Sequence, residues 1–435
     1  MNALEQSLRS KEQSASTTAK PAAAPIKGAA RESSGGARPS TEARLLRRLL
    51  QAYGDPPFEI VLWNGERIPP AHAESVASIH IRDRGALFGL LRDSQMRFGD
   101  GYSDGSIQID GDLIQFLEVL YRSSAAMEGR ASVLRGLSRL LKRPRSNTLA
   151  GSRENIHHHY DIGNDFYSLW LGQTMAYTCA YYPTEAATLD EAQRAKMDHV
   201  CRKLRLRPGE TVVEAGFGWG ALALHMARHY GVKVRGFNIA HQQVEYARAR
   251  ARAEGLESRV EYIEDDYRNI SGHYDAFVSV GMLEHVGVDN YPELGRVAQR
   301  ALGSNGRGLI HSIGRNRPAS LQRWIERRIF PGAYPPSLKE MMQIFEPWDL
   351  SILDVENLRL HYARTLRHWL ALYEANVARV RTMFDDKFVR MWRLYLAGSV
   401  AGFTTGTLQL FQVVFAPGDN NDIPLTRAYM YPGAG

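Results

Sequence analysis

From about residue 208 onward, short apolar strands alternate with helices, and this alternation limits the possible folds more than any other feature of the sequence. The predicted elements are strands at 211–215, 233–238, 260–263, 276–280 and 308–313, with helices at 222–230 and 242–254 after the first two. Strands connected through helices lie parallel in one sheet, with helices on its faces. The pattern therefore predicts an α/β fold, a Rossmann-like doubly wound sheet that binds ligands at the carboxyl ends of its strands.

The first predicted strand-to-helix turn is rich in glycine. Residues 214–221 read Glu-Ala-Gly-Phe-Gly-Trp-Gly-Ala, and Gly216, Gly218 and Gly220 alternate through the turn. Glycine permits positive φ angles and lets a ligand approach the backbone closely. The helix N-terminus that follows favours a negatively charged group. The turn is therefore a candidate cofactor site.

Two cofactors fit such a loop, NAD and S-adenosylmethionine (SAM). Gly216, Gly218 and Ala221 satisfy the dinucleotide pattern GxGxxA. A NAD site also has an acid about 20 residues further on, but the second strand ends at Asn238. The acid closes the first strand instead, as Glu214. These two features favour SAM, although the glycine pattern alone leaves NAD open.

Asp266 and Tyr267 end the third predicted strand. A carboxylate at that position can accept a hydrogen bond from the adenine amino group, and an aromatic ring can stack on the base. Both residues are therefore candidate adenine contacts. On spacing alone, a solvated acidic turn is the alternative.

The chain of 435 residues is long for one domain, so two folded units and additional segments are expected. Residues 1–41 lack a hydrophobic period, and residues 42–121 show short predicted strands and helices. Residues 122–153 hold eight Lys or Arg and a single Glu. The predicted division is a disordered tail at 1–41, a small α+β domain at 42–121, a basic linker or helical segment at 122–153 and an α/β domain at 154–435.

The composition is that of a globular protein with excess positive charge. Hydrophobic residues make up 44% and charged residues 23%, and no stretch approaches the roughly 18 apolar residues of a membrane span. The net charge of +7 attracts nucleic acid or an anionic membrane. No nucleic-acid recognition motif is visible, so nucleic acid is not the expected partner.

Cys179 and Cys201 are the two cysteines, and no Cys/His cluster has the spacing of zinc ligands. The run His157-His158-His159 does not predict a metal site, because consecutive side chains cannot easily converge on one ion. The first residues lack the apolar core of a secretion signal. A reducing cytoplasm is the expected compartment.

Several long motifs carry a family resemblance. Residues 159–167 (His-Tyr-Asp-Ile-Gly-Asn-Asp-Phe-Tyr) and 177–182 (Tyr-Thr-Cys-Ala-Tyr-Tyr) closely resemble the cyclopropane-fatty-acyl-phospholipid synthases and their mycolic acid methyltransferase relatives. Further matches follow in the family's order at 281–287, 311–314, 329–332, 361–366 and 409–415. A shorter match at 98–105 resembles part of the family's small lipid-binding domain. The resemblance therefore implies a lipid-binding-like domain at 42–121 and a SAM-dependent catalytic domain at 154–435.

The resemblance implies a reaction. The methyl carbon of SAM is transferred to the cis double bond of an unsaturated phospholipid acyl chain, which leaves a carbocation on the chain. Bound bicarbonate then removes a proton from the added methyl, and a cyclopropane ring closes. Water must be excluded, because it would capture the cation.

The family's bicarbonate ligands map onto Cys179, Glu284, His311, the backbone of Ile313, and Tyr362. Bicarbonate can donate its hydroxyl to the Glu284 carboxylate while the other groups donate to its oxygens. Taken singly, Cys179 reads as a small buried apolar residue, Tyr362 as a buried ring and His311 as a core histidine. Within matched motifs, they are predicted catalytic residues.

The predicted SAM contacts lie in three parts of the chain. Resemblance assigns one pair of residues to the amino-acid end of SAM, the glycines to the loop, and residues after the second and third strands to the adenosine. Glu214 and Asn238 close the first two strands and complete the set. The full set is Tyr177, Thr178, Glu214, Gly216, Gly218, Gly220, Asn238, Ile239, Gln243, Asp266 and Tyr267.

Four positions depart from the family pattern. Phe217 replaces a usual Cys, Ala221 a usual Gly, Asn238 a usual Thr and Glu214 a usual Asp. These changes bear on the product more than on the cofactor. A methyl- or methylene-branched chain is the nearest alternative product, followed by methylation of a small molecule. A lipid-binding protein without activity would require a broken cofactor site, and the loop at 214–221 is intact.

The expected partner is a membrane phospholipid with an unsaturated acyl chain. The basic segments at 122–153 and 315–328 would help hold the protein at anionic lipid. The resemblance and the charge together predict a cytoplasmic protein associated peripherally with the inner face of the cytoplasmic membrane. A homodimer is possible.

Overall fold

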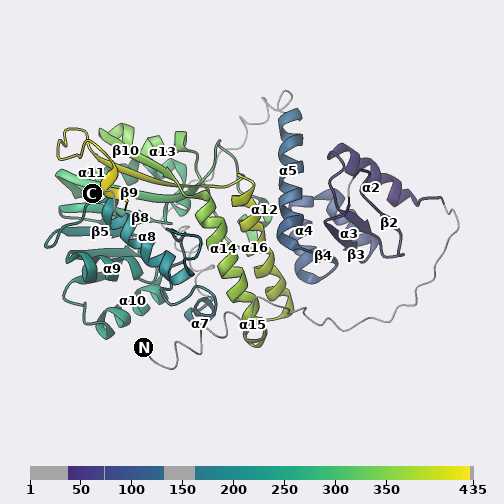
Figure 1. Ribbon diagram of the computed structural model, residues 1–435, viewed down its shortest axis with the longest axis horizontal. Coiled ribbons are helices and arrows are strands. Elements are labelled where there is room, and N and C mark those ends of the chain that lie inside the picture. Colours follow the sequence, from purple (N-terminus) through teal and green to yellow (C-terminus); the bar gives the residue numbers. More distant parts are fainter. Residues whose placement is uncertain (1–37, 73, 132–161, 432–435) are drawn as a thin grey trace. The chain divides into compact units, whose positions relative to one another are not determined.

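The computed structural model describes residues 38–72, 74–131 and 162–431 (Figure 1). Most of the predicted tail (1–37), most of the predicted basic linker (132–153) and the His157-His158-His159 run lie outside the described residues. The chain divides into two units, residues 1–41 and 42–435.

The N-terminal part of this unit is a small α+β domain, which confirms the predicted class. Among the described residues its sheet has the order β2-β1-β3-β4, with β1 and β3 parallel and the other pairs antiparallel. Alternate residues of β3 point into the core. Its elements are α2 (Thr41–Ala52), β1 (Glu59–Val61), β2 (Arg67–Ile68), β3 (Ala77–Ile81), α3 (Arg84–Arg92), α4 (Ser94–Asp104), β4 (Ile107–Gly111) and α5 (Leu113–Ala131), the last of which continues beyond residue 121.

The C-terminal part of the unit contains a seven-stranded sheet of order β10-β11-β9-β8-β5-β6-β7. Its strands are β5 (Thr211–Ala215), β6 (Lys233–Asn238), β7 (Val260–Glu264), β8 (Tyr274–Val280), β9 (Leu302–Gly314), β10 (Leu350–Asn357) and β11 (Gln409–Pro417). The five strands β5 to β9 are parallel, as predicted.

β10 and β11 were not among the predicted strands, and β11 runs antiparallel to both β9 and β10. The reason lies in the connection before it. β10 ends at the carboxyl edge of the sheet, and the chain passes through α14 (Arg359–Ala375), α15 (Val377–Met383) and α16 (Asp386–Thr404) before β11 begins at that same edge. β11 must therefore run back through the sheet.

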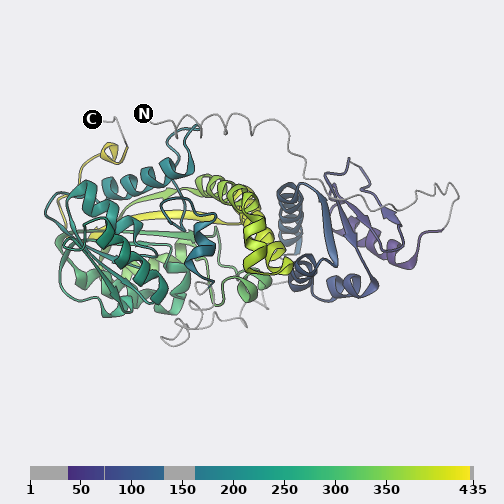
Figure 2. The ribbon, with the colours of Figure 1, turned by 90° about the horizontal axis from the view of Figure 1, so that it is seen from below.

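Helices cover both faces of this sheet, so it is doubly wound as predicted (Figure 2). One core contains apolar side chains of α8, α9 and α10, and the other contains those of α11 and α13. The remaining bounds are α7 (Asn164–Ser168), α8 (Leu189–Lys203), α9 (Ala221–Tyr230), α10 (His241–Ala253), η2 (Tyr267–Asn269), η3 (Leu283–His285), η4 (Val288–Asn290), α11 (Tyr291–Ala301), α12 (Arg323–Arg328), α13 (Leu338–Phe345), η5 (Glu346–Trp348) and η6 (Ala428–Met430). None of the described helices is both long enough and apolar enough to cross a bilayer.

Helix α12 packs against α4 of the small domain. A Cβ atom at Gly99 would lie 2.5 Å from the Trp324 indole, so only glycine allows this approach. Arg328 pairs with Asp100 at 3.0 Å and Arg323 pairs with Asp93 at 2.9 Å. These two arginines belong to the basic segment proposed above to attract lipid, and in the structure they form ion pairs within the chain.

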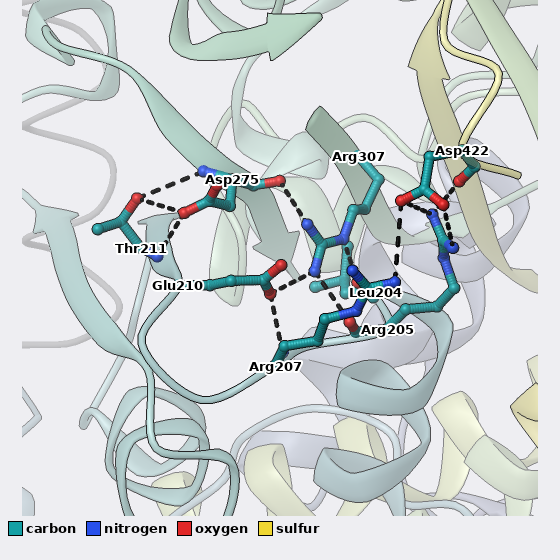
Figure 3. A network of polar contacts seen from close by, with 8 residues as sticks. All are labelled: Leu204, Arg205, Arg207, Glu210, Thr211, Asp275, Arg307 and Asp422. Atoms are coloured by element: carbon teal, nitrogen blue, oxygen red, sulfur yellow. Dashed lines mark hydrogen bonds and ion pairs between the residues drawn. The ribbon is translucent and has the colours of Figure 1, made fainter. Parts of the chain in front are cut away.

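Buried Arg307 of β9 lies toward the amino ends of the strands, opposite the predicted site (Figure 3). Its guanidinium donates to the carbonyl oxygens of Leu204 and Asp275 and pairs with Glu210. The Asp275 carboxylate also accepts from the backbone of Thr211 at 2.8 Å. The network ties together the starts of β5 and β8 and the end of α8.

Candidate active site

The glycine loop adopts the backbone that its sequence predicts. Gly216, Gly218 and Gly220 have φ angles of 83°, 56° and 82°. A Cβ atom at Gly216 would lie 2.9 Å from Met282, whereas one at Gly218 would meet no atom within 4 Å. The backbone at Gly218 is therefore open to a ligand.

The ends of β6 and β7 lie beside this loop. The Asn238 side chain donates to Gln243 Oε1 at 2.8 Å and to the Gly218 carbonyl at 3.4 Å. The backbone N–H of Asp265 donates to the Asn238 carbonyl at 3.1 Å, and half-buried Ile239 follows directly. Three predicted cofactor residues, Gly218, Asn238 and Gln243, are therefore in contact.

Asp266 and Tyr267 follow β7, which is separated from β5 and its glycine loop by β6. Buried Asp266 caps η2 by accepting from the backbone N–H of Arg268 at 2.9 Å, and its second oxygen lies 3.4 Å from the Arg268 guanidinium. Arg268 also lies over the Tyr267 ring. The pair is at the carboxyl end of β7 as predicted, and no hydrogen bond between these described residues and the loop is present.

Glu214 ends β5 with its side chain buried, and its Oε2 atom has no hydrogen-bond partner among the described residues. Burial raises the pKa of this carboxyl to about 8, and the nearby ammonium of Lys196 opposes that rise. A buried acceptor of this kind fits a ligand that brings a donor, such as an ammonium group.

The Thr178 segment is held by α8. Lys196 Nζ donates to Thr178 Oγ1 at 2.8 Å, and the Gln193 amide donates to the carbonyls of Ala176 and Thr178 at 3.2 and 2.9 Å. Burial lowers the pKa of Lys196 to about 8. Lys196 and Gln193 were not among the residues predicted from the sequence. They lie one helical turn apart on the buried face of α8.

Tyr177 lies in a group of aromatic rings that also includes Tyr167, which packs on Trp219 of the glycine loop. The Tyr177 hydroxyl lies 2.7 Å from that of Tyr395 on α16, and its ring packs against Trp170 and Trp369. These rings form part of a large buried aromatic cluster between α7, α14 and α16. The cluster makes this side of the site apolar.

Glu284 and Ile313 contact each other in the structure. The backbone N–H of Ile313 donates to Glu284 Oε1 at 2.6 Å. Glu284 is buried, and its Oε2 atom has no partner among the described residues. Burial raises the pKa of Glu284 to about 7, and the hydrogen bonds to its carboxylate oppose that rise.

His311 lies on β9, buried, with its two ring nitrogens in different surroundings. Nδ1 is 3.0 Å from the Gln412 side-chain amide, and Nε2 has no partner in the described part of the chain. Burial first, and then the ammonium of Lys196, hold the pKa of His311 well below its usual value. The ring is therefore neutral.

Cys179 and the backbone of Tyr362 both approach the carbonyl of Leu358, the residue before α14. Cys179 Sγ lies 3.9 Å from the Leu358 carbonyl, which also accepts from the backbone N–H of Tyr362 at 3.2 Å. Leu358 bonds in turn to Leu410, the cross-strand partner of Ile313. Burial raises the pKa of the Cys179 thiol, so it is not a nucleophile.

The glycine loop, Thr178, Glu284 and His311 all lie toward the carboxyl ends of the central strands. A Cβ atom at Gly281, after β8, would lie 2.9 Å from the Thr178 side chain, and the Gly281 N–H donates to the His311 carbonyl at 2.8 Å. The unpartnered atoms of Glu214, Glu284 and His311 are buried polar groups that call for ligands. The described residues contain no group of three or more His, Cys, Asp or Glu side chains able to hold a metal.

The sheet order, the antiparallel β11 and the glycine turn after β5 define the fold of SAM-dependent methyltransferases. A solved mycolic acid cyclopropane synthase, complexed with SAH and CTAB, has this fold, with a TM-score of 0.58 and 28% sequence identity over 60% of this chain and 97% of its own. The chain belongs to the family described as mycolic acid cyclopropane synthetase, whose model matches residues 148–413. The resemblance seen in the sequence is thereby confirmed.

Two curated relatives cover most of the chain. A probable fatty acid methyltransferase of Pseudomonas putida is 35% identical over 86% of this chain and 96% of its own length. The cyclopropane-fatty-acyl-phospholipid synthase of Escherichia coli strain K12 is 33% identical over 81% and 91%. Residues 45–131 match a separate domain family of unknown function.

Proposed function

We propose that this protein transfers the methyl carbon of SAM to the cis double bond of an unsaturated phospholipid acyl chain and closes a cyclopropane ring. The observation that carries the proposal is the pairing of a glycine-loop cofactor cradle with buried, unpartnered atoms of Glu284 and His311 at the same sheet edge. The Escherichia coli relative is named for this reaction.

The cofactor would be held from three sides. The loop of Gly216, Gly218 and Gly220, with Asn238, Ile239 and Gln243 beside it, would take the adenosine, and Asp266 and Tyr267 would face the adenine. Tyr177, Thr178 and Glu214 would take the amino-acid end. Open backbone at Gly218 and the unpartnered Glu214 oxygen support this assignment. SAM supplies an electrophilic methyl group that even an alkene can attack.

The second ligand would be bicarbonate, held by Cys179, Glu284, His311, the Ile313 backbone and Tyr362. When bound, bicarbonate supplies a base for the proton of the added methyl. Glu284 Oε2 would accept the hydroxyl of the ion, while His311 Nε2 would donate to one of its oxygens. The residues fit this ion, because one buried acceptor and one buried ring nitrogen lie without partners in the described part of the chain.

The chain's own residues must also protect a cation from water. The rings of Trp170, Tyr177 and Trp369 pack against one another in an apolar core, in which both indoles are fully buried. A cation formed beside this core would be stabilised by the half-buried Tyr177 ring and by the bound anion. This arrangement favours a lipid chain over a small polar substrate.

The alternative product is a methyl- or methylene-branched chain. It is favoured by the Pseudomonas putida relative, which is named a probable fatty acid methyltransferase. Both products start with the same methyl transfer and the same cation. A methylene branch forms if a hydride shifts to the cationic carbon before the added methyl loses its proton, and a saturated methyl branch requires a reductant in addition. A small-molecule methyltransferase would instead be active without lipid and without the small domain.

We place the reaction at the inner face of the cytoplasmic membrane, with the protein peripherally associated from the cytoplasm as a monomer or a homodimer. The proposal rests on the net charge of +7 and the lipid substrate. Vesicle binding that weakens as salt rises, without comparable binding to oligonucleotides, would support it.

The experiment is to incubate the purified protein with SAM, bicarbonate and vesicles of oleoyl phosphatidylglycerol. Gas chromatography with mass spectrometry of the released fatty acids separates a ring from a branched alkene of equal mass. We expect a cyclopropane chain. A branched product would select the alternative, and no gain of a CH₂ unit would refute both.

A further inference from the structure

His311 belongs to a row of three side chains on one face of the sheet. His311 on β9 is paired with Gln412 on β11, which is paired with Glu356 on β10. Directly paired residues on neighbouring strands point to the same face. Gln412 is fully buried and His311 nearly so, which shields their contact from water.

The contact between His311 and Gln412 joins two nitrogen atoms. Gln412 Nε2 lies 3.0 Å from His311 Nδ1. An amide nitrogen donates and cannot accept, so Nδ1 must be the unprotonated acceptor. In a neutral imidazole the proton then resides on Nε2, the ring nitrogen without a partner among the described residues.

We propose that Gln412 is a positioning residue that holds His311 in the Nε2–H tautomer. The ring thereby presents a hydrogen-bond donor, rather than a lone pair, to the anion site beside Glu284. The first statement stands on the geometry alone, and the second rests on the proposed function.

A wrong tautomer would be costly at this place. With the proton on Nδ1, two N–H groups would face each other across the Gln412 contact, and the Nε2 lone pair would face an oxygen of the anion. The charged ring is also disfavoured, because the ammonium groups of Lys196 and Lys203 lie near it. One neutral tautomer remains.

The direct test is nitrogen NMR of the full-length protein labelled with ¹⁵N-histidine, with the His311 signals assigned by their loss in His311→Gln. The chemical shifts of the two ring nitrogens report which one carries the proton. We expect Nε2–H in the native protein, a mixture in Gln412→Met, and Nδ1–H in Gln412→Glu, whose carboxylate accepts. Gln409→Met is the matched control, since Gln409 lies on the same strand and its side chain bonds to Gly406 and Asn357 rather than to His311.

Two results would overturn the proposal: a native ring protonated on Nδ1, or an unchanged tautomer in Gln412→Met. Since Gln412→Glu is not guaranteed to fold, the methionine variant is sufficient alone. These spectra need neither SAM nor lipid, so they are independent of the proposed function.

A second readout tests the role in the reaction. In Gln412→Met we expect the bicarbonate concentration for half-maximal turnover to rise about tenfold, the effect of one lost hydrogen bond. The KM for SAM should not change. A native enzyme indifferent to bicarbonate would refute the anion site while leaving the tautomer result intact, and a raised KM for SAM alone would refute the positioning role.

Discussion

Replacing Glu284 by glutamine removes one charge from the centre of the proposed anion site and changes little else. The amide oxygen of the introduced side chain can still accept from the Ile313 N–H, which lies 2.6 Å from Oε1 in the native chain. The other oxygen, Oε2, has no partner among the described residues and becomes an NH₂ group that cannot accept the hydroxyl of bicarbonate.

The magnitude follows from the lost hydrogen bond. A hydrogen bond to a charged group contributes about 1.5–3 kcal/mol, which corresponds to a loss in turnover of about 10- to 150-fold. SAM binding should stay within about twofold, because the affected atom faces the anion rather than the loop. Turnover is measured with vesicles and affinity by calorimetry, with Glu293→Gln on the surface of α11 as control. Full turnover in Glu284→Gln would refute the anion-site assignment.

The same variant has a predicted stability profile. Burial raises the pKa of Glu284 from 4.5 to about 7, so between these values the folded chain binds more protons than the unfolded chain. The stability of the native protein therefore falls as pH rises through that window, and the glutamine variant lacks this contribution. In urea unfolding, the free energy of unfolding of Glu284→Gln should rise relative to that of the native protein between pH 4.5 and 7. A parallel pH dependence of the two proteins would contradict the buried, unpaired state.

Three further substitutions test other parts of the structure. Gly220→Ala puts a Cβ at a φ of 82° and against the Tyr262 ring, so urea unfolding should show a loss of about 1–3 kcal/mol. Lys196 donates to the Thr178 hydroxyl oxygen, so the proton of that hydroxyl remains available to SAM. Lys196→Met removes this donor, and calorimetry should show about tenfold weaker binding of SAM. Trp324→Ala empties the buried space beside α4 and should lower the free energy of unfolding by about 3–5 kcal/mol. Unchanged values would contradict the respective contacts.

The parallel part of the sheet was predictable because its strands are short apolar runs and helices follow the first two of them. The direction of β11 was not, since it depends on where α14, α15 and α16 return the chain. Local sequence does not encode that return point. The small domain was predictable as α+β from its short elements, but the contact of Trp324 with α4 depends on folding at long range.

For the site, the glycines were predictable from local backbone requirements, and the motif residues came from resemblance. The role of Gln412 was not, although it lies in a matched motif. Its contact with His311 depends on the register of two strands about a hundred residues apart. Lys196 was detectable in principle, because a lysine on the apolar face of a helix needs a partner.

The most direct measurement of the central claim uses SAM with a fully deuterated methyl group and oleoyl phospholipid vesicles. If the added methyl loses a proton to a base held at Glu284 and His311, the product is a cyclopropane whose new carbon keeps two of its three deuterium atoms. A product that keeps all three, or an acyl chain without the added carbon, would contradict the account.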